Sequence, residues 1–211
     1  MRLAVEEGTS PEIRRLIYRE KYERGEARCL LACLEPQDVV LEVGAGRGYL
    51  TTLAALHVGS ERVFAYEANP ELLPLIATTF DRNGVRPQLT HAVLGAGAGT
   101  ATFYVEEHYL SSSRQQRSAG ARPVEVPQLD AAAELARVRP TVVIMDIEGG
   151  EATLVPLFDW RGVAKIVLEI HPALLGPEGT RAVLDHLTGQ GFVEVQRLSS
   201  TRKKLFLRPR A

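Results

Sequence analysis

The chain has 211 residues, of which 45% are hydrophobic and 24% are charged, so it is long enough to bury one large core. Its formal net charge of -1 gives no overall attraction for nucleic acid or for an anionic membrane surface. No apolar stretch approaches the roughly 18 residues of a membrane-spanning helix, and the N-terminus soon becomes a charged run. We therefore expect one cytoplasmic domain spanning residues 1–211.

Helical periodicity comes first along the chain, in an N-terminal segment of residues 1–37. Ser10, Pro11 and Glu12 resemble an N-cap, a proline at the first helical position and an acidic first turn. They predict a helix running to about Leu34, with a break near Gly25. Cys29 and Cys33 fall within it and have no partner at zinc spacing, which favours buried thiols.

Strands and helices then alternate through a core of residues 38–211. The predicted elements are strand 38–44, helix 48–57, strand 62–67, helix 69–83, strand 88–94, strand 100–107, helix 129–138, strand 141–146, a short helix after 150, strand 164–172, helix 178–190 and strands 191–198 and 203–209. This alternation predicts an α/β fold with a doubly wound, mostly parallel sheet, helices on both faces and a C-terminal antiparallel hairpin. Residues 107–123 lack an apolar period and are predicted to be a long loop, with Ser111 to Ser113, Arg114 and Arg117 forming an acceptor lid or an unordered segment.

A glycine-rich loop follows the first core strand and opens a helix, with the sequence Glu42-Val43-Gly44-Ala45-Gly46-Arg47-Gly48. Glycines let the backbone approach a ligand closely. A dinucleotide fingerprint needs glycine at position 49, where this chain has Tyr49. The carboxylate of Glu42 would repel a pyrophosphate, yet it could accept a hydrogen bond from the ammonium group of S-adenosylmethionine (SAM).

Glu67 ends the second core strand, where an acidic side chain can accept both hydroxyls of a ribose. That feature serves NAD and SAM equally, and a tight turn with a helix-capping glutamate is the simpler alternative. The glycine spacing and Glu42 favour SAM over NAD.

At this point the sequence resembles the FkbM-type SAM-dependent methyltransferases, which have the seven-stranded, Rossmann-like class-I fold. The resemblance runs from Tyr22 to Pro172 and rests on the glycine loop, the Glu67-Ala68-Asn69-Pro70 turn, Asn83, the AVLGAGAGTATFYV segment from Ala92, the Leu129-Asp130 helix start and, as the family's hallmark D-x-E-G-x-E, residues 146–151. The family usually has Asp in place of Glu42, commonly Asn in place of Gly46, and often Pro in place of Ala68. The resemblance implies a SAM site formed by Glu42, Gly44, Ala45, Gly46, Gly48, Glu67, Ala68, Asn69, Ala92, Val93 and Asp146.

Acidic residues and one histidine end the later strands, and the carboxyl ends of parallel strands share one rim of the sheet. We expect Asp146 to orient the methyl acceptor or act as base, Glu148 to support it or to bond the acceptor, and His171 to be a second base candidate. An alternative role for Asp146, Glu148, Glu169 and His171 is a divalent cation site, for example for Mg²⁺. Glu151 is more simply a helix cap.

The resemblance implies an O-methyltransferase acting on a hydroxyl of a small molecule, a sugar or a secondary metabolite. N-methylation of an amine, or a SAM-binding or S-adenosylhomocysteine (SAH)-binding module without turnover, are the alternatives. We expect no nucleic-acid partner, because the basic C-terminal residues Arg202 to Arg210 have no interleaved aromatic platform and suit a solvated hairpin edge. No membrane partner is expected, and a homodimer is left open.

Overall fold

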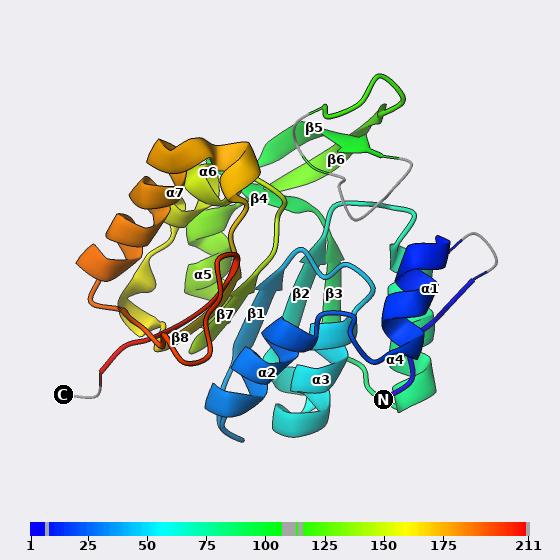
Figure 1. Ribbon diagram of the computed structural model, residues 1–211, viewed down its shortest axis with the longest axis horizontal. Helices are drawn as coiled ribbons and strands as arrows, with labels where there is room; N and C mark the ends of the chain where they lie inside the picture. Colours follow the sequence, from blue (N-terminus) through cyan, green and yellow to red (C-terminus); the bar gives the residue numbers. More distant parts are fainter. Residues whose placement is uncertain (7–8, 107–112, 114–115, 210–211) are drawn as a thin grey trace.

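The computed structural model describes residues 1–6, 9–106, 113 and 116–209, and it contains a seven-stranded sheet with the order β3-β2-β1-β7-β8-β10-β9 (Figure 1). The first five strands in this order pair in parallel, whereas β10 runs antiparallel to both β8 and β9. The strand bounds are β1 Val40–Val43, β2 Val63–Glu67, β3 Gln88–His91, β7 Val142–Met145, β8 Lys165–Glu169, β9 Val193–Glu194 and β10 Lys203–Leu207. The predicted α/β sheet with a C-terminal antiparallel hairpin is confirmed.

Helices cover both faces of this sheet, and alternate strand residues show which face each helix covers. In β7, Val142 and Ile144 pack with helices α2, α3 and α4, whereas Val143 and Met145 pack with α5, α6 and α7 (Figure 1). Because successive strand side chains point to opposite faces, a strand apolar at every position is buried on both sides. The helix bounds are α1 Pro11–Tyr18, α2 Arg24–Cys33, α3 Tyr49–Val58, α4 Leu73–Asn83, α5 Ala131–Val138, α6 Glu151–Leu154 and α7 Pro172–Gly189.

The N-terminal segment forms two helices with a break between them, as predicted. The Ser10 side chain accepts a hydrogen bond from the Ile13 amide, so the predicted start of α1 is confirmed. The break, however, lies between Tyr18 and Arg24, where Glu20 and Glu23 have positive φ angles of 54° and 46°. Gly25 is the second residue of α2, so the break lies just before the predicted position.

A second, three-stranded sheet extends from one end of the main sheet, with the order β4-β6-β5 (Figure 1). Its bounds are β4 Val93–Gly95, β5 Gly99–Val105 and β6 Arg122–Asp130. The strand predicted at 88–94 is therefore two strands in different sheets. Strand β6 was not predicted, because Pro123 and Pro127 lack the amide donor that strands use and gave the segment the character of a loop.

Residues 107–112 and 114–115 of the predicted long loop, which include Ser111, Ser112 and Arg114 of the predicted acceptor lid, fall outside the described residues. Ser113 pairs with Tyr104 of β5 in an isolated bridge. Helix α7 begins at Pro172, earlier than predicted, and has a kink at Gly176, where φ is 68°. In the described part of the chain, no helix combines the length and the apolar character needed to cross a membrane.

Candidate active site

A cavity of about 370 Å³ opens where the strands β1, β2 and β7 end. Eight of the residues predicted to hold a cofactor line it: Gly44, Gly46, Glu67, Ala68, Asn69, Ala92, Val93 and Asp146. Glu148 lines it too, as do Tyr22 and Glu23 from the segment between α1 and α2. Ala45, Gly48 and Glu42 contribute to the loop and strand beneath the cavity rather than to its lining. A volume of this size suits a small-molecule ligand.

The glycine loop approaches the end of β7 closely. Gly44 has a φ of 87°, and a Cβ atom added there would lie 1.8 Å from the carbonyl oxygen of Asp146. No side chain could occupy this position without separating the two strand ends. Gly44 therefore allows the loop and Asp146 to border one cavity.

Glu67 links the loops that follow β1 and β2. Its carboxylate accepts a hydrogen bond from the Gly46 amide at 2.8 Å and another from the Asn69 amide at 2.7 Å. The residue is buried, and this burial raises the pKa of Glu67 to about 7, against the lowering effect of the amides. A carboxylate has more lone pairs than these two amides use, so Glu67 can still accept hydrogen bonds from a ligand in the cavity.

Glu42 lies on β1 and is fully buried beneath the loop. The hydroxyl group of Thr51 on α3 donates a hydrogen bond to its carboxylate. Burial raises the pKa of Glu42 to about 8, and the charges of Glu67 and Asp146 add to this effect, whereas the Thr51 hydrogen bond opposes it. A role for Glu42 toward a ligand ammonium group would have to act through the loop or through water.

Arg47 of the same loop holds the N-terminal segment in place. Its side chain is completely buried, and its guanidinium group donates to the Ala4 carbonyl at 2.8 Å and to the hydroxyl of Thr9 at 3.1 Å. Sequence reasoning did not single out Arg47, because an arginine in a glycine loop resembles a solvated residue. The N-terminal segment thus packs directly against the loop that borders the cavity.

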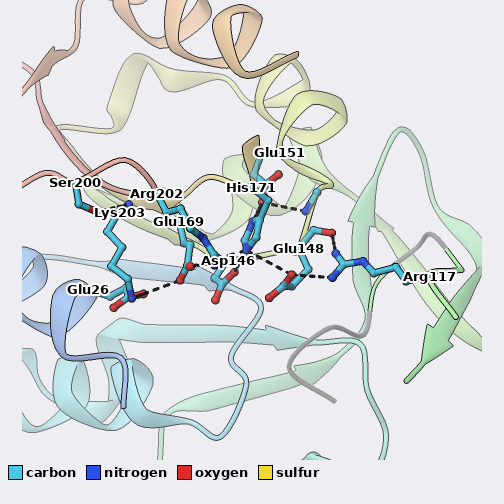
Figure 2. Close-up of polar contacts among 11 residues, drawn as sticks. Glu26, Arg117, Asp146, Glu148, Glu151, Glu169, His171, Ser200, Arg202 and Lys203 are labelled. Atoms are coloured by element: carbon cyan, nitrogen blue, oxygen red, sulfur yellow. Dashed lines mark hydrogen bonds and ion pairs between the residues drawn. The ribbon is translucent and has the colours of Figure 1, made fainter. Parts of the chain in front are cut away.

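A cluster of carboxylates surrounds one histidine at the ends of β7 and β8 (Figure 2). The Nε2 atom of His171 lies 3.6 Å from Asp146 Oδ1 and 3.4 Å from Glu148 Oε2. Glu148 has a positive φ of 51°, a conformation that is unfavourable for a residue other than glycine. The three residues predicted to be catalytic are therefore brought together by two strand ends and a strained turn.

The other ring nitrogen of His171 is held by Glu151. The Nδ1 atom lies 2.7 Å from Glu151 Oε1, and the same oxygen accepts a hydrogen bond from the Gly149 amide at 3.2 Å. Glu151 is completely buried at the start of α6. The simpler prediction made it a helix cap, whereas the structure shows it orienting His171 as well.

Charge and burial change the protonation of this cluster. Burial lowers the pKa of His171, but the carboxylates of Glu148, Glu151 and Asp146 outweigh it and raise the pKa to about 10. His171 therefore carries a proton at neutral pH. Burial, together with the charge of Glu169, raises the pKa of Asp146 well above its usual range, although a third of the side chain remains accessible.

Cations from distant parts of the chain balance the outer carboxylates (Figure 2). Arg117 forms an ion pair with Glu148 at 2.9 Å, and Arg202 forms one with Glu169 at 2.6 Å. Lys203 pairs with Glu26 of α2 and lies 3.8 Å from Glu169. Arg202 is exposed, in line with the predicted solvated hairpin edge, but Arg202 and Lys203 also pair with acids of the site.

Comparison with known proteins identifies what this arrangement is similar to. The sequence profile of a family described as the methyltransferase FkbM domain matches residues 42–194. A search of curated proteins gave no match.

Solved structures of methyltransferases are similar to this chain at low sequence identity, and two with a TM-score above 0.5 show the same fold. A methyltransferase from Pyrococcus furiosus is 13% identical, with a TM-score of 0.51 over 96% of this chain and 100% of that chain. A candidate O-methyltransferase from Klebsiella pneumoniae is 10% identical, with a TM-score of 0.51 over 95% of this chain and 91% of that one. The precorrin-6y C5,15-methyltransferase from Geobacter metallireducens is 16% identical, with a TM-score of 0.48 over 91% and 77% of the two chains.

Proposed function

Because the chain belongs to the FkbM methyltransferase domain family and is a SAM-dependent methyltransferase, we propose that it methylates a hydroxyl oxygen of a small-molecule acceptor. One observation carries this proposal. A single cavity extends from the glycine loop and Glu67 to Asp146 and Glu148, so a cofactor and an acceptor can meet at the end of β7. We also propose that residues 1–211 form one methyltransferase domain, since the N-terminal segment borders this cavity and the C-terminal strand β10 is part of the main sheet.

The residues around the cavity fit SAM. Gly44 and Gly46 leave room for a ligand next to the backbone, and Glu67 offers carboxylate oxygens for the ribose hydroxyls. The cavity lining contains Glu23, Glu67, Asp146 and Glu148 and no lysine or arginine among the described residues, which suits a cationic ligand without phosphates. In this proposal Ala68, Asn69, Ala92 and Val93 complete the cofactor site from the adjoining strand ends.

SAM, when bound, supplies a methyl group on a positively charged sulfur. Asp146 borders the cavity and is placed to accept a hydrogen bond from the acceptor hydroxyl and then its proton. Its raised pKa makes the carboxylate a better proton acceptor than an ordinary aspartate. Glu148, held by Arg117, is placed to accept a second hydrogen bond that orients the acceptor.

His171 acts as a positioning residue in this mechanism. It contacts Asp146 and Glu148 but is not part of the cavity lining, and Glu151 fixes its ring. With a pKa of about 10 it is protonated at neutral pH, which favours charge support for the two carboxylates over the role of a base.

The test combines binding and turnover. Calorimetric titration with SAH should show one site per chain, and tritiated SAM should then identify hydroxyl acceptors in a panel of small molecules. Asp146→Asn should lower turnover by about 10²-fold or more, the usual range for loss of a general base, with SAH affinity changed less than about threefold. Asp185→Asn on the exposed face of α7 is the matched control.

Three other results would contradict the proposal. Failure to bind SAM and SAH would remove its basis, and tight SAH binding without transfer to any acceptor would favour a binding module. Methyl groups found on nitrogen in the product would favour an N-methyltransferase.

A further inference from the structure

The pair formed by Asp146 and Glu148 faces a buried imidazole nitrogen that has no hydrogen-bond partner. His171 is 5% exposed, and its Nε2 atom makes no hydrogen bond to any described residue. Asp146 Oδ1 is likewise buried without a hydrogen bond. Buried polar atoms are nearly always satisfied, whereas these two make only a long ion-pair contact of 3.6 Å with each other, so a ligand bound by both atoms would satisfy them.

The tautomer of His171 defines what can bind there. Glu151 Oε1 is 2.7 Å from Nδ1 and, as a buried carboxylate, requires a donor at that nitrogen. Nε2 is then the ring nitrogen that faces the carboxylates of Asp146 and Glu148. Without a metal, a proton on Nε2 lies in this space, and a metal ion bound by the three side chains would replace that proton.

The charges of the wider cluster lead to the same conclusion. The residues around His171 include the acids Glu26, Asp146, Glu148, Glu151 and Glu169 and the cations Arg117, Arg202 and Lys203 (Figure 2). The carboxylates outnumber these cations, so the cluster can attract a further cation.

We propose that Asp146, Glu148 and His171 bind a divalent cation, Mg²⁺ or Mn²⁺, at the acceptor end of the cavity. One ligand atom from each residue lies within 4.8 Å of the others. The Nε2 atom is already 3.4 to 3.6 Å from the two carboxylate oxygens, near the roughly 3 Å between neighbouring ligands in an octahedral Mg²⁺ or Mn²⁺ site. Two carboxylates and one imidazole suit these metals.

The surroundings of the three ligands resemble those of a metal site. A metal-binding histidine commonly donates its other ring N–H to a carboxylate, as Glu151 allows here. The Glu148 carboxylate is oriented by Arg117 and by the strained backbone of its turn. Glu169, the fourth candidate from the sequence, pairs with Arg202 at 2.6 Å and is therefore excluded from our ligand set.

This inference deepens the proposed function, on which its catalytic meaning rests. A cation bound at this place would polarise an acceptor hydroxyl next to it and lower the pKa of that hydroxyl, which would assist the transfer of its proton to the carboxylate oxygen of Asp146 that does not bind the cation. Metal binding itself can be measured without SAM or an acceptor.

The experiment is Mn²⁺ titration of the EDTA-treated full chain, followed by the loss of the electron paramagnetic resonance signal of free Mn²⁺. We expect one Mn²⁺ per chain, displaced by excess Mg²⁺. His171→Ala and Glu148→Gln should each weaken Mn²⁺ binding at least about tenfold, and Glu151→Gln, which acts through His171, about 10- to 100-fold. His57→Ala and Glu178→Gln, on the exposed surfaces of α3 and α7, should leave it unchanged.

Circular dichroism shows whether each variant is folded. If His171→Ala does not fold, the Mn²⁺ affinity of Glu148→Gln, which changes a partly exposed residue, tests the metal site. No Mn²⁺ binding, or binding unaffected by the ligand substitutions, would overturn the proposal. Titration with SAH on the same samples separates the two ideas. SAH binding without Mn²⁺ binding removes only the metal site, whereas Mn²⁺ binding without SAH binding removes the proposed function.

Discussion

Replacement of Gly44 by alanine tests the close approach on which the site depends. The new methyl group would lie 1.8 Å from the Asp146 carbonyl oxygen, where an ordinary contact is 3.4 to 4 Å, so the ends of β1 and β7 would have to move apart by more than 1 Å. The φ of 87° adds a backbone penalty of about 1–2 kcal/mol, and the overpacking adds about 1–3 kcal/mol. For a chain of this size, these penalties lower the melting temperature by about 5–15 °C.

Gly97→Ala is the matched control, because Gly97 has a similar φ of 81° but no atom within 4 Å of an added Cβ. It carries the backbone penalty alone and should lower the melting temperature by about 2–6 °C. The assay is thermal unfolding followed by circular dichroism, with SAH titration below the transition. Gly44→Ala should also weaken SAH binding by about tenfold or more, or about 1.4 kcal/mol, whereas Gly97→Ala should not. Equal losses of melting temperature and SAH affinity in the two variants would refute the reasoning.

Three further outcomes follow from the geometry of the site. Glu67→Ala removes the carboxylate that links Gly46 and Asn69. Calorimetry should show SAH binding about 10- to 100-fold weaker, which corresponds to the loss of one strong charged hydrogen bond. An unchanged affinity would contradict the role of Glu67 in the cofactor site. The pKa of Glu42 is raised to about 8 in the folded chain, so between about pH 4.5 and 8 the folded state holds a proton that the unfolded state has lost, and stability should fall as pH rises. Urea unfolding across that pH range gives the free energy of unfolding, and Glu42→Gln should remove a slope of up to about 1.4 kcal/mol per pH unit from it. An unchanged slope in the variant would show that Glu42 is not the titrating group. Arg117→Ala frees Glu148 and should raise the KM for the acceptor several-fold with SAH affinity unchanged, and a loss confined to SAH affinity would place Arg117 at the cofactor instead.

Local patterns in the chain were sufficient for the order of the elements and for the position of the site. Strand β7 is apolar at every position, which marks burial on both faces, and the acids after it fall at the rim where parallel strands end. The glycines after β1 and Glu67 at the end of β2 could be identified in the same way, because the conformation of each loop depends on residues close together in the sequence. These features need no knowledge of which distant segments meet.

The pairings within the site depended on tertiary structure. Arg202 reaches Glu169 only because β10 enters the sheet antiparallel to β8, and no local pattern specifies that neighbour. Arg117 reaches Glu148 from the segment between β5 and β6. Strand β6 itself was not predicted, because its prolines are unusual in a strand.

The same limit explains why Glu151 was underrated. Its position at the start of α6 satisfies the rule for a helix cap, and that rule refers only to its own helix. Its contact with His171, twenty residues further along the chain, depends on β7 and β8 lying side by side and ending at the same level. Residue spacing along the chain determines which side chains lie at the end of a strand. Which of these side chains touch is determined by the packing of the strands and loops, because the contacts join segments that are far apart in the sequence.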